Sequence, residues 1–281
     1  MNRYAYVTVL YGNNIYLTGA IVLGYSLMKT NTKFDRVILV TKDVSESYRS
    51  MLSEVYTDCI EIDYIEANPK IFLETTRFRD VFTKLECLNL IMYDKIILLD
   101  LDMIVTQNID HLFQLHPPAA CLKRSNVEYG QIIPREKICD SSLKLVGSIN
   151  AGLMLLRPDI TELDDIKNDI IKNDRLMNLK YPEQDYLSLR YCGKWTSITF
   201  NYNYQFGLTA RVKQLKYTLD DIHVIHYSSS FKPWNQLDPN HTETEEEGKF
   251  QRQHTKYYKL WTSAYHKIKS ELKNININLP Y

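Results

Sequence analysis

The stretch Lys95-Ile96-Ile97-Leu98-Leu99-Asp100-Leu101-Asp102 decides the fold of this chain. Its apolar run predicts a strand buried on both faces, which is typical of a parallel sheet in an α/β protein. The two aspartates follow at the strand's carboxyl end, where ligands bind in open α/β sheets. Carboxylates in this position can hold Mg²⁺ or Mn²⁺ together with the oxygens of a diphosphate.

The aspartate pair alone is weak evidence, because an Asp-x-Asp triplet also fits a solvated turn with an Asx cap. Its position strengthens the metal interpretation. Two charges at the end of a buried strand are costly unless something neutralises them.

Strands and helices alternate before the aspartates. We expect strands at 4–10, 36–41 and 59–65 and helices at 16–28 and 45–54. This alternation predicts a single Rossmann-like, mostly parallel mixed sheet flanked by helices. The helix at 16–28 is apolar on nearly all sides and should lie buried against the sheet.

After the aspartates, the polar residues 124–148 predict a surface excursion near the site. An apolar run at 153–156 precedes a helix capped by Asp159 that should reach about Leu176. A β run ends at His226, and one long helix is expected from Thr242. Its apolar stripe should pack onto the domain or onto a partner subunit, which makes a homodimer an expectation; the stripe comprises Phe250, Tyr257, Trp261, Tyr265, Ile268 and Leu272.

Composition excludes several classes of protein. The 281 residues carry 34 Lys and Arg against 34 Asp and Glu, so no net charge steers the chain toward nucleic acid or an anionic membrane. There is no G-x-G-x-x-G or P-loop motif, which argues against dinucleotide and ATP sites. No apolar run approaches the roughly 20 residues that span a bilayer.

The chain starts directly with a strand pattern rather than a signal peptide, and its five scattered cysteines fit reduced thiols, so we expect a cytoplasmic protein. The 21 tyrosines, with many Ile, Asn and Lys, are typical of an AT-rich genome such as that of a large DNA virus. For a viral protein the expected location is the host cytoplasm.

A series of motifs resembles glycosyltransferase family 8, the glycogenin-like retaining glycosyltransferases. The motifs fall in the family's order over about residues 4 to 235. They are Phe82-Thr83-Lys84-Leu85, Tyr93-Asp94-Lys95, Asp100-Leu101-Asp102, Asn108-Ile109-Asp110-His111-Leu112-Phe113, Asn150-Ala151-Gly152-Leu153, Glu183-Gln184-Asp185-Tyr186-Leu187, and His226 followed by Lys232-Pro233-Trp234.

The resemblance implies a GT-A type fold, a UDP-sugar donor and a metal cofactor. Its metal ligands would be Asp100, Asp102 and His226, and an imidazole ligand favours Mn²⁺ over Mg²⁺. A histidine at a strand end is otherwise more often structural. The predicted domains are a GT-A domain at 1–240, with a nucleotide-binding half to about 115 and a sugar and acceptor half at 116–240, and a C-terminal helix and tail at 241–281.

Further roles follow from the resemblance alone. Lys84 and Lys232 would lie on the diphosphate, and Arg77 or Arg79 would add a phosphate contact. Tyr16 would stack on the uracil ring, a contact of about 1–3 kcal/mol in nucleic-acid sites. The complete set for the nucleotide and donor is Thr8, Leu10, Tyr11, Tyr16, Lys84, Asp100, Leu101, Asp102, Asn150, Ala151, Gly152, Gln184, Ser229 and Lys232.

The residues expected at the sugar are Asn150, Glu183 and Gln184, which with Lys84 form the predicted catalytic set. Glu183 stands where the family usually has Asp, and acidic residues at a helix start are also favoured by the helix dipole alone. No covalent nucleophile is assigned. Glu183 and Asp185 are candidates, whereas front-face attack by the acceptor needs neither.

The sequence thus predicts a manganese-dependent retaining glycosyltransferase that moves a hexose, by default glucose, from a UDP-sugar to a hydroxyl of a glycan or protein. Self-glycosylation stays open, because residues 200–206 contain tyrosines whereas 207–216 contain none. The alternatives are a UDP-sugar hydrolase and a catalytically silent module that binds sugar nucleotides or glycans.

Overall fold

A computed structural model of the chain describes residues 3–67, 80–123, 127–172, 179–208, 217–274 and 279. Arg77 and Arg79, expected near the phosphates, lie outside these residues, as do the predicted end of the helix near Leu176 and most of 207–216. No described helix combines the length and the apolar character needed to cross a membrane.

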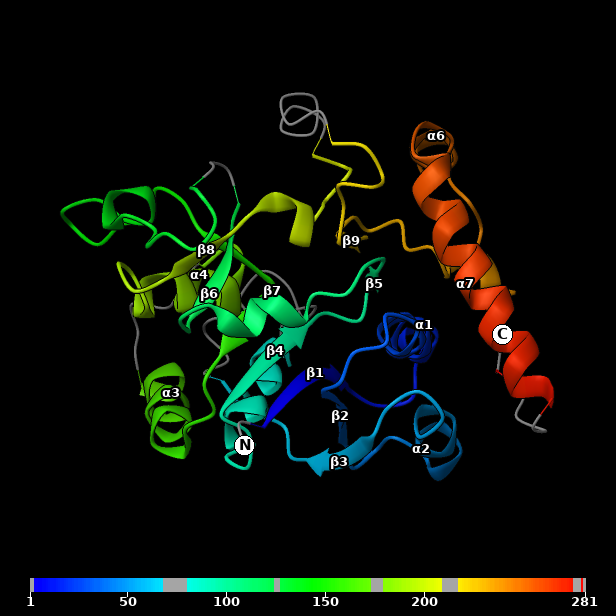
Figure 1. The fold of residues 1–281 in the computed structure, drawn as a ribbon, viewed down its shortest axis with the longest axis horizontal. Coiled ribbons are helices and arrows are strands. Elements are labelled where there is room, and N and C mark those ends of the chain that lie inside the picture. Colours follow the sequence, from blue (N-terminus) through cyan, green and yellow to red (C-terminus); the bar gives the residue numbers. More distant parts are fainter. Residues whose placement is uncertain are drawn as a thin grey trace.

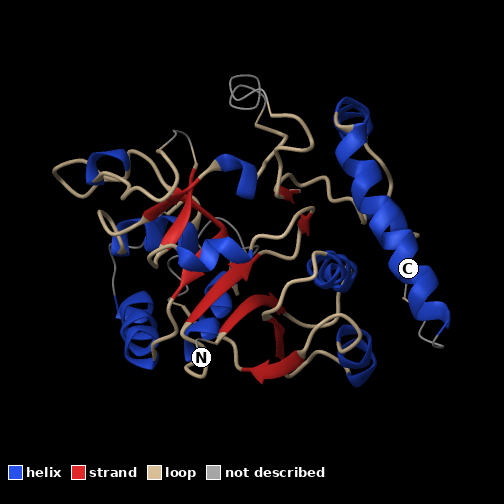
Figure 2. Ribbon diagram, in the orientation of Figure 1, coloured by secondary structure: helices blue, strands red, loops and turns tan. Residues whose placement is uncertain are grey.

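Within the described residues, seven strands form one sheet in the order β3-β2-β1-β4-β7-β6-β8 (Figures 1 and 2). Only β7 among them runs antiparallel to its neighbours β4 and β6, so the predicted mostly parallel mixed sheet is confirmed. The strands are β1 (Tyr4–Leu10), β2 (Asp35–Thr41), β3 (Asp58–Ile62), β4 (Lys95–Leu99), β6 (Ala119–Leu122), β7 (Ile149–Leu156) and β8 (Thr196–Ile198).

Helices cover both faces of this sheet. The α-helices are α1 (Tyr16–Lys29), α2 (Glu46–Leu52), α3 (Ile160–Lys172), α4 (Pro182–Arg190), α6 (Glu245–Gln253) and α7 (Thr255–Asn274). The 3₁₀ helices are η3 (Val81–Asn89), η4 (Asp110–Gln114), η5 (Arg135–Lys137), η7 (Phe200–Tyr202) and η8 (Asn235–Leu237). Lys84 therefore lies on a 3₁₀ helix, η3.

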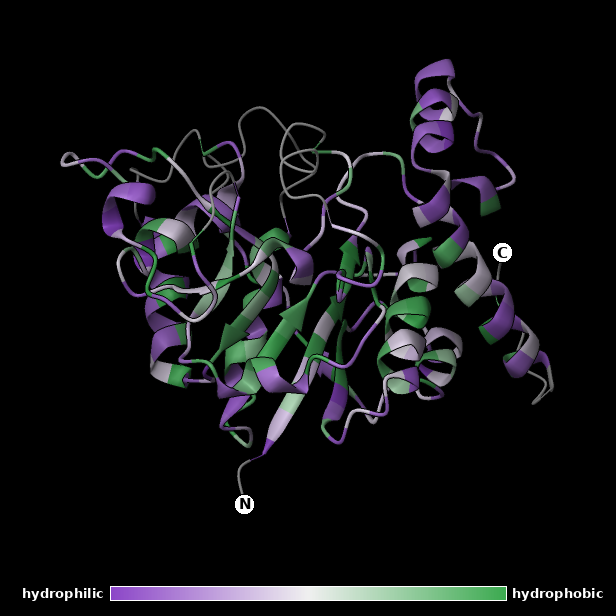
Figure 3. Cartoon of the chain, turned by 45° about the horizontal axis from the view of Figure 1, so that its top comes forward, coloured by the Kyte–Doolittle hydropathy of each residue, from purple (hydrophilic) through white to green (hydrophobic). Residues whose placement is uncertain are grey.

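Successive side chains along each strand point to opposite faces of the sheet, so the core forms one layer on each face. Ala5, Val7 and Val9 of β1 pack in one cluster with residues of η3, α3 and α4. The opposite face packs against α1, where every residue from Leu17 to Leu27 is buried, as predicted for this apolar helix. Figure 3 shows the hydrophobic strands enclosed between helices whose outer surfaces are largely hydrophilic.

A second, two-stranded sheet brings distant residues to the end of β4. β5 (Met103–Val105) pairs antiparallel with β9 (Val224–His226), and Met103 lies opposite His226. The backbone N–H of Tyr227 also donates to the carbonyl of Asp102 at 2.8 Å. The end of β9 is therefore fixed beside the predicted metal aspartates.

The C-terminal region corrects one prediction, because the expected single helix from Thr242 is two helices, α6 and α7. The break falls at His254, whose backbone leaves the helical conformation and whose ring packs on Phe206 and Phe250. Most of the predicted stripe, from Tyr257 to Leu272, is buried within this chain, with α7 beside α1 (Figure 1). That burial removes the observation on which the expected homodimer rested.

Gly19 allows the loop after β9 to pack on α1. A Cβ atom at this position would lie 2.7 Å from the carbonyl oxygen of Leu101 and 2.7 Å from the indole of Trp234. Both distances are too short for a real contact. Glycine is therefore required here by close approach, although it costs about 1 kcal/mol in a helix relative to alanine.

We predict that Gly19→Ala destabilises the protein by about 1–3 kcal/mol despite the gain in helix propensity, because the added methyl overpacks the contact. The free energy of unfolding in urea measures this change. Gly248→Ala in α6 is the matched control, since its Cβ would meet only the flexible ends of Glu243 and Arg252 at 3.0 and 3.1 Å. A Gly19 variant as stable as the Gly248 variant would contradict this packing role.

Candidate functional site

A cleft of about 790 Å³ opens at the carboxyl ends of β1 and β4, where the sequence places the aspartates. It brings together most of the predicted site residues. These are Leu10, Tyr11, Tyr16, Lys84, Asp100, Leu101, Asp102, Asn150, Glu183, Gln184, His226, Ser229 and Lys232.

Thr8, Ala151 and Gly152 are the predicted site residues that are not among the described residues lining this cleft. Thr8 is buried, and its hydroxyl donates to the carbonyl of Leu99 at 2.7 Å, so it joins β1 to the end of β4. The backbone N–H of Ala151 donates to Gln184 Oε1 at 3.4 Å. These residues support the residues that line the cleft.

Several lining residues carry no signal in the sequence motifs, among them Lys123, Tyr181, Gln205 and Phe250. Lys123 could be located only from the direction of β6 in the sheet. It follows the short apolar run of β6, which runs in the same direction as β4, so both strands end at the same edge of the sheet. The rule that singled out Asp100 therefore applies to Lys123 as well.

Lys84 compensates two carboxylates on one side of the cleft. Its Nζ lies 2.6 Å from Asp100 Oδ1 and 3.5 Å from Glu183 Oε1. Burial acts to lower the pKa of Lys84, but Asp100 and Glu183 outweigh it and raise this pKa well above its ordinary value. Burial raises the pKa of Glu183, with Lys84 acting in the opposite direction. The amine is therefore a fixed positive charge.

Asp102 is compensated from the other side. Lys232 Nζ lies 2.5 Å from Asp102 Oδ2, and His226 Nε2 lies 3.2 Å from Asp102 Oδ1. Burial acts to raise the pKa of Asp102, but the positive charge of Lys232 holds it well below its ordinary value. This aspartate is therefore ionised and can act as a ligand.

A relay of hydrogen bonds determines which nitrogen of His226 carries the proton. The backbone N–H of Gly152 donates to Asn150 Oδ1 at 3.0 Å, and a backbone amide can only donate. Asn150 Oδ1 is thus the acceptor for Asn203 Nδ2 at 2.7 Å, which turns Asn203 Oδ1 toward His226 Nδ1 at 2.8 Å. We assign a proton to Nδ1 on this basis, so in the neutral imidazole the Nε2 lone pair faces Asp102.

In the neutral imidazole two electron-pair donors, His226 Nε2 and Asp102 Oδ1, face each other at 3.2 Å. A cation between them would turn that unfavourable contact into coordination. Asp100, Asp102 and His226 each offer a ligand atom within 4.8 Å of the others, and the second nitrogen of His226 is oriented by an amide, as in many metal sites. The residues present therefore fit a divalent metal.

Gly152 lies directly beneath His226. A Cβ atom there would lie 2.5 Å from His226 Cε1 and 2.9 Å from His226 Nδ1. The absence of a side chain at Gly152 therefore makes room for the imidazole ring.

The aromatic side of the cleft lies next to β1. Tyr16 is 38% exposed, and its ring stands edge-on to Trp234 with centroids 5.1 Å apart. Tyr11 packs at a tilt on Tyr64, with centroids 6.5 Å apart. An exposed, supported ring such as that of Tyr16 offers a face to a base, so the predicted stacking on uracil stays a prediction that this geometry permits.

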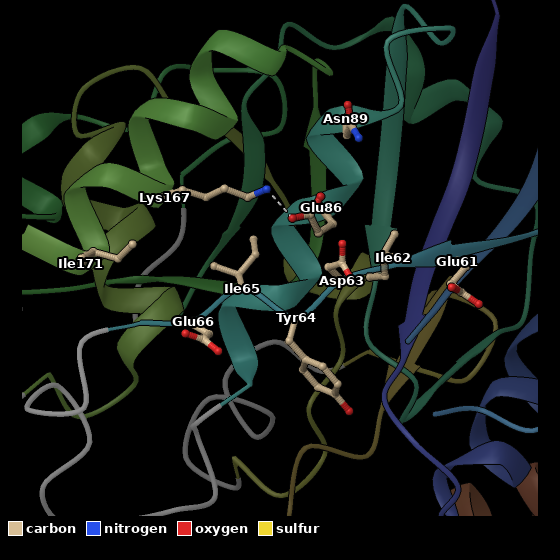
Figure 4. Close-up of a pocket in the computed structure, with 10 residues that line it drawn as sticks. All are labelled: Glu61, Ile62, Asp63, Tyr64, Ile65, Glu66, Glu86, Asn89, Lys167 and Ile171. Atoms are coloured by element: carbon tan, nitrogen blue, oxygen red, sulfur yellow. Dashed lines mark ion pairs between the residues drawn. The ribbon is translucent and has the colours of Figure 1, made fainter. Parts of the chain in front are cut away.

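A second pocket, of about 480 Å³, lies beside β3, η3 and α3 (Figure 4). Acidic side chains dominate it, and Lys167 forms an ion pair with the buried Glu86 at 2.5 Å. The described residues of this pocket hold none of the predicted site residues. We therefore place the functional site in the larger cleft.

Comparisons with known proteins find a matching family model and several relatives. A family model described as Glycosyl transferase family 8 matches residues 7–238. An uncharacterized protein of Acanthamoeba polyphaga mimivirus is 65% identical over 282 residues, with 100% of both chains covered. Inositol phosphorylceramide glucuronosyltransferase 1 of Arabidopsis thaliana is 29% identical over 258 residues, which cover 83% of this chain and 43% of that protein.

Glycogenin-2 of Homo sapiens is 39% identical over 112 residues, covering 39% of this chain and 22% of that protein. Among solved structures, an active-site mutant of LgtC gives a TM-score of 0.62 at 17% identity, with 94% and 95% of the two chains covered. GlyE of Streptococcus pneumoniae gives 0.58 at 19% identity, with 100% of this chain and 65% of that chain covered. These structural similarities show a shared GT-A fold.

We predict that Asn203→Ala frees the ring of His226 to populate both tautomers, because Nδ1 loses its acceptor. Nitrogen-15 NMR of the imidazole should show the Nδ1-protonated tautomer in the parent protein and a mixture in the variant. Mn²⁺ affinity should fall about 10- to 100-fold, as for other orienting partners of metal ligands. Asn201→Ala is the control, since Asn201 bonds to the carbonyl of Asp221. A neutral ring protonated only at Nε2 in the parent protein would refute the relay.

We predict that Glu183→Gln stabilises the metal-free protein at alkaline pH. A carboxyl whose pKa is raised on folding contributes stability below its unfolded pKa, near 4.5, and this contribution is lost as pH rises through the folded pKa. Glutamine does not titrate, so the melting temperature of the variant should exceed that of the parent at alkaline pH and match it near pH 4. The exposed Glu136→Gln variant should show no such trend. A constant difference at all pH values would contradict the burial of charge at Glu183.

Proposed function

Because the chain belongs to glycosyltransferase family 8, we propose that this glycosyltransferase moves a sugar from a UDP-sugar to an acceptor hydroxyl with retention of configuration and with Mn²⁺ as cofactor. The observation that carries this proposal is the joint placement of Asp100, Asp102 and His226 in one cleft between two buried lysines. This combination of metal ligands and fixed positive charge suits the binding of a diphosphate.

We assign different parts of the cleft to the nucleoside, the metal and the diphosphate. Leu10, Tyr11 and Tyr16 would hold the nucleoside against β1, with Leu101 and Ser229 nearby in the lining. Asp100, Asp102 and His226 would hold the metal, which when bound supplies positive charge opposite the diphosphate of the departing UDP. Lys84 and Lys232 add charge that is already in place before the reaction, so no reorganisation is needed during it.

Glu183, Gln184 and Asn150 would face the sugar. The bond between the anomeric carbon and the diphosphate oxygen breaks, and its electron pair leaves with UDP. The acceptor oxygen forms the new bond to the same carbon, and the acceptor's hydroxyl proton is released. Carboxylate and amide oxygens nearby can stabilise the cationic character of the sugar in this step.

The acceptor we propose is a separate glycan or protein. Self-glycosylation at residues 200–206 would need an exposed tyrosine hydroxyl. Tyr202 is 9% exposed and lies 2.7 Å from His111 Nε2, and Tyr204 is 1% exposed and accepts from Tyr257 at 3.0 Å. Both hydroxyls are hydrogen-bonded within the chain, and that of Tyr204 lies in the core, which argues against either as the acceptor.

We predict that UDP release from a matching UDP-sugar requires Mn²⁺ and falls at least about 100-fold in Asp102→Asn, because a neutral amide is a far weaker ligand than a carboxylate. A coupled assay for UDP, with and without chelator, over a panel of UDP-sugars measures this. Asp94→Asn is the matched control, since Asp94 is an exposed carboxylate immediately before β4. Release that persists in Asp102→Asn or in chelator would overturn the proposed mechanism.

A further inference from the structure

Lys123 is, with Lys84 and Lys232, one of the lysines among the described residues that line the cleft. It follows β6 directly, and its backbone N–H donates to the carbonyl of Ser148 at 2.8 Å, which continues the pairing of β6 with β7. β6 runs parallel to β4, so Lys123 and Asp100 project from the same edge of the sheet.

The ammonium of Lys123 is held on an aromatic ring. Its Nζ lies 3.5 Å from the centroid of Tyr181, which also lines the cleft and directly precedes α4. α4 carries Glu183 and Gln184 in its first turn. The charge therefore lies on the wall that we assign to the sugar.

The other lysines of this cleft serve a different part of it. Among the described residues that line it, Lys84 bonds to Asp100 and Lys232 bonds to Asp102, where the diphosphate would lie. Lys123 faces Tyr181 and also influences the nearby Asp185. Burial raises the pKa of Asp185, and the positive charge of Lys123 acts to lower it. Asp185 is buried outside the lining and already accepts from the backbone N–H of Tyr181 at 3.0 Å.

A positive charge at this wall discriminates between sugars. An ammonium carries three donors, and its attraction to a ring face does not fix the direction of each of them. The amides of Asn150 and Gln184 are the groups that we assign to neutral sugar hydroxyls. A hydrogen bond to a carboxylate is charge-assisted and roughly twice as strong as one between neutral groups.

We propose that the donor is a UDP-activated hexuronic acid rather than a UDP-hexose such as UDP-glucose, and that Lys123 binds the carboxylate of the sugar. This inference rests on the proposed function and narrows its donor. The carboxylate takes no part in the bonds made and broken, so the transfer step is unchanged. Lys123 acts as a specificity-determining residue.

The test compares UDP-glucuronate and UDP-galacturonate with UDP-glucose and UDP-galactose, with UDP itself as reference. Binding is measured by calorimetry in the presence of Mn²⁺, and turnover by UDP release. Three full-length variants are used: Lys123→Met, Lys123→Arg and the control Lys180→Met. Lys180 is exposed and lies 5.7 Å from the same ring of Tyr181 but does not line the cleft, so its variant removes an equal charge from the same neighbourhood.

We expect the parent protein to prefer one uronate over its neutral counterpart. Lys123→Met should weaken the binding of the preferred UDP-uronate about 10- to 100-fold, mainly as a higher KM, while the binding of UDP and of the neutral UDP-hexoses is unchanged. Lys123→Arg should restore part of the preference, and Lys180→Met should retain all of it. If Lys123 had only a structural role, its replacement would instead weaken the binding of every ligand to the same degree.

Two results would overturn the inference, and they are distinguishable. If UDP and a neutral UDP-hexose bind with Mn²⁺ and the uronates bind no better, or if Lys123→Met leaves the preference intact, the inference fails while the proposed function stands. If neither UDP nor any UDP-sugar binds the folded protein, the proposed function fails and the inference fails with it.

Discussion

The buried carboxylate of Asp102 is the charge on which the architecture of the cleft depends. Its side chain is 13% exposed, and such a group is costly to the fold unless it is paired. Its main partner, Lys232, lies 130 positions later in the chain. The pairing of β5 with β9 and the packing of Trp234 on Gly19 bring that loop into place. The contacts that bring Lys232 to Asp102 thus also pack the C-terminal region over the edge of the sheet.

Much of this arrangement could be predicted, because its signals are carried by neighbouring residues. The apolar run of β4 ending in two aspartates specifies a buried strand and a ligand-binding edge without reference to the rest of the chain. The period of the apolar residues likewise locates β1, β2 and α1. His226 and Lys232 reach the same cleft only through the order of motifs that resembles the family, since no local pattern connects them to Asp102.

What could not be predicted depends on contacts between distant segments. The break between α6 and α7 follows from the packing of the His254 ring on Phe206, and helix propensity alone carries no sign of it. Asn203 orients His226, but its partners lie 53 and 23 positions away, and no motif includes it. Lys123 lies outside every motif as well. It becomes visible only when the direction of β6 in the sheet is known.

The close contact between Gly152 and His226 changes how the Asn150-Ala151-Gly152 motif should be used to judge other chains with this fold. A chain can keep both aspartates and the histidine and still fail to place the imidazole, if a larger residue occupies the position of Gly152. A comparison of the metal ligands alone would predict that such a chain binds the cation. The absence of a side chain at one buried position is thus as informative about cation binding as the presence of the ligands themselves.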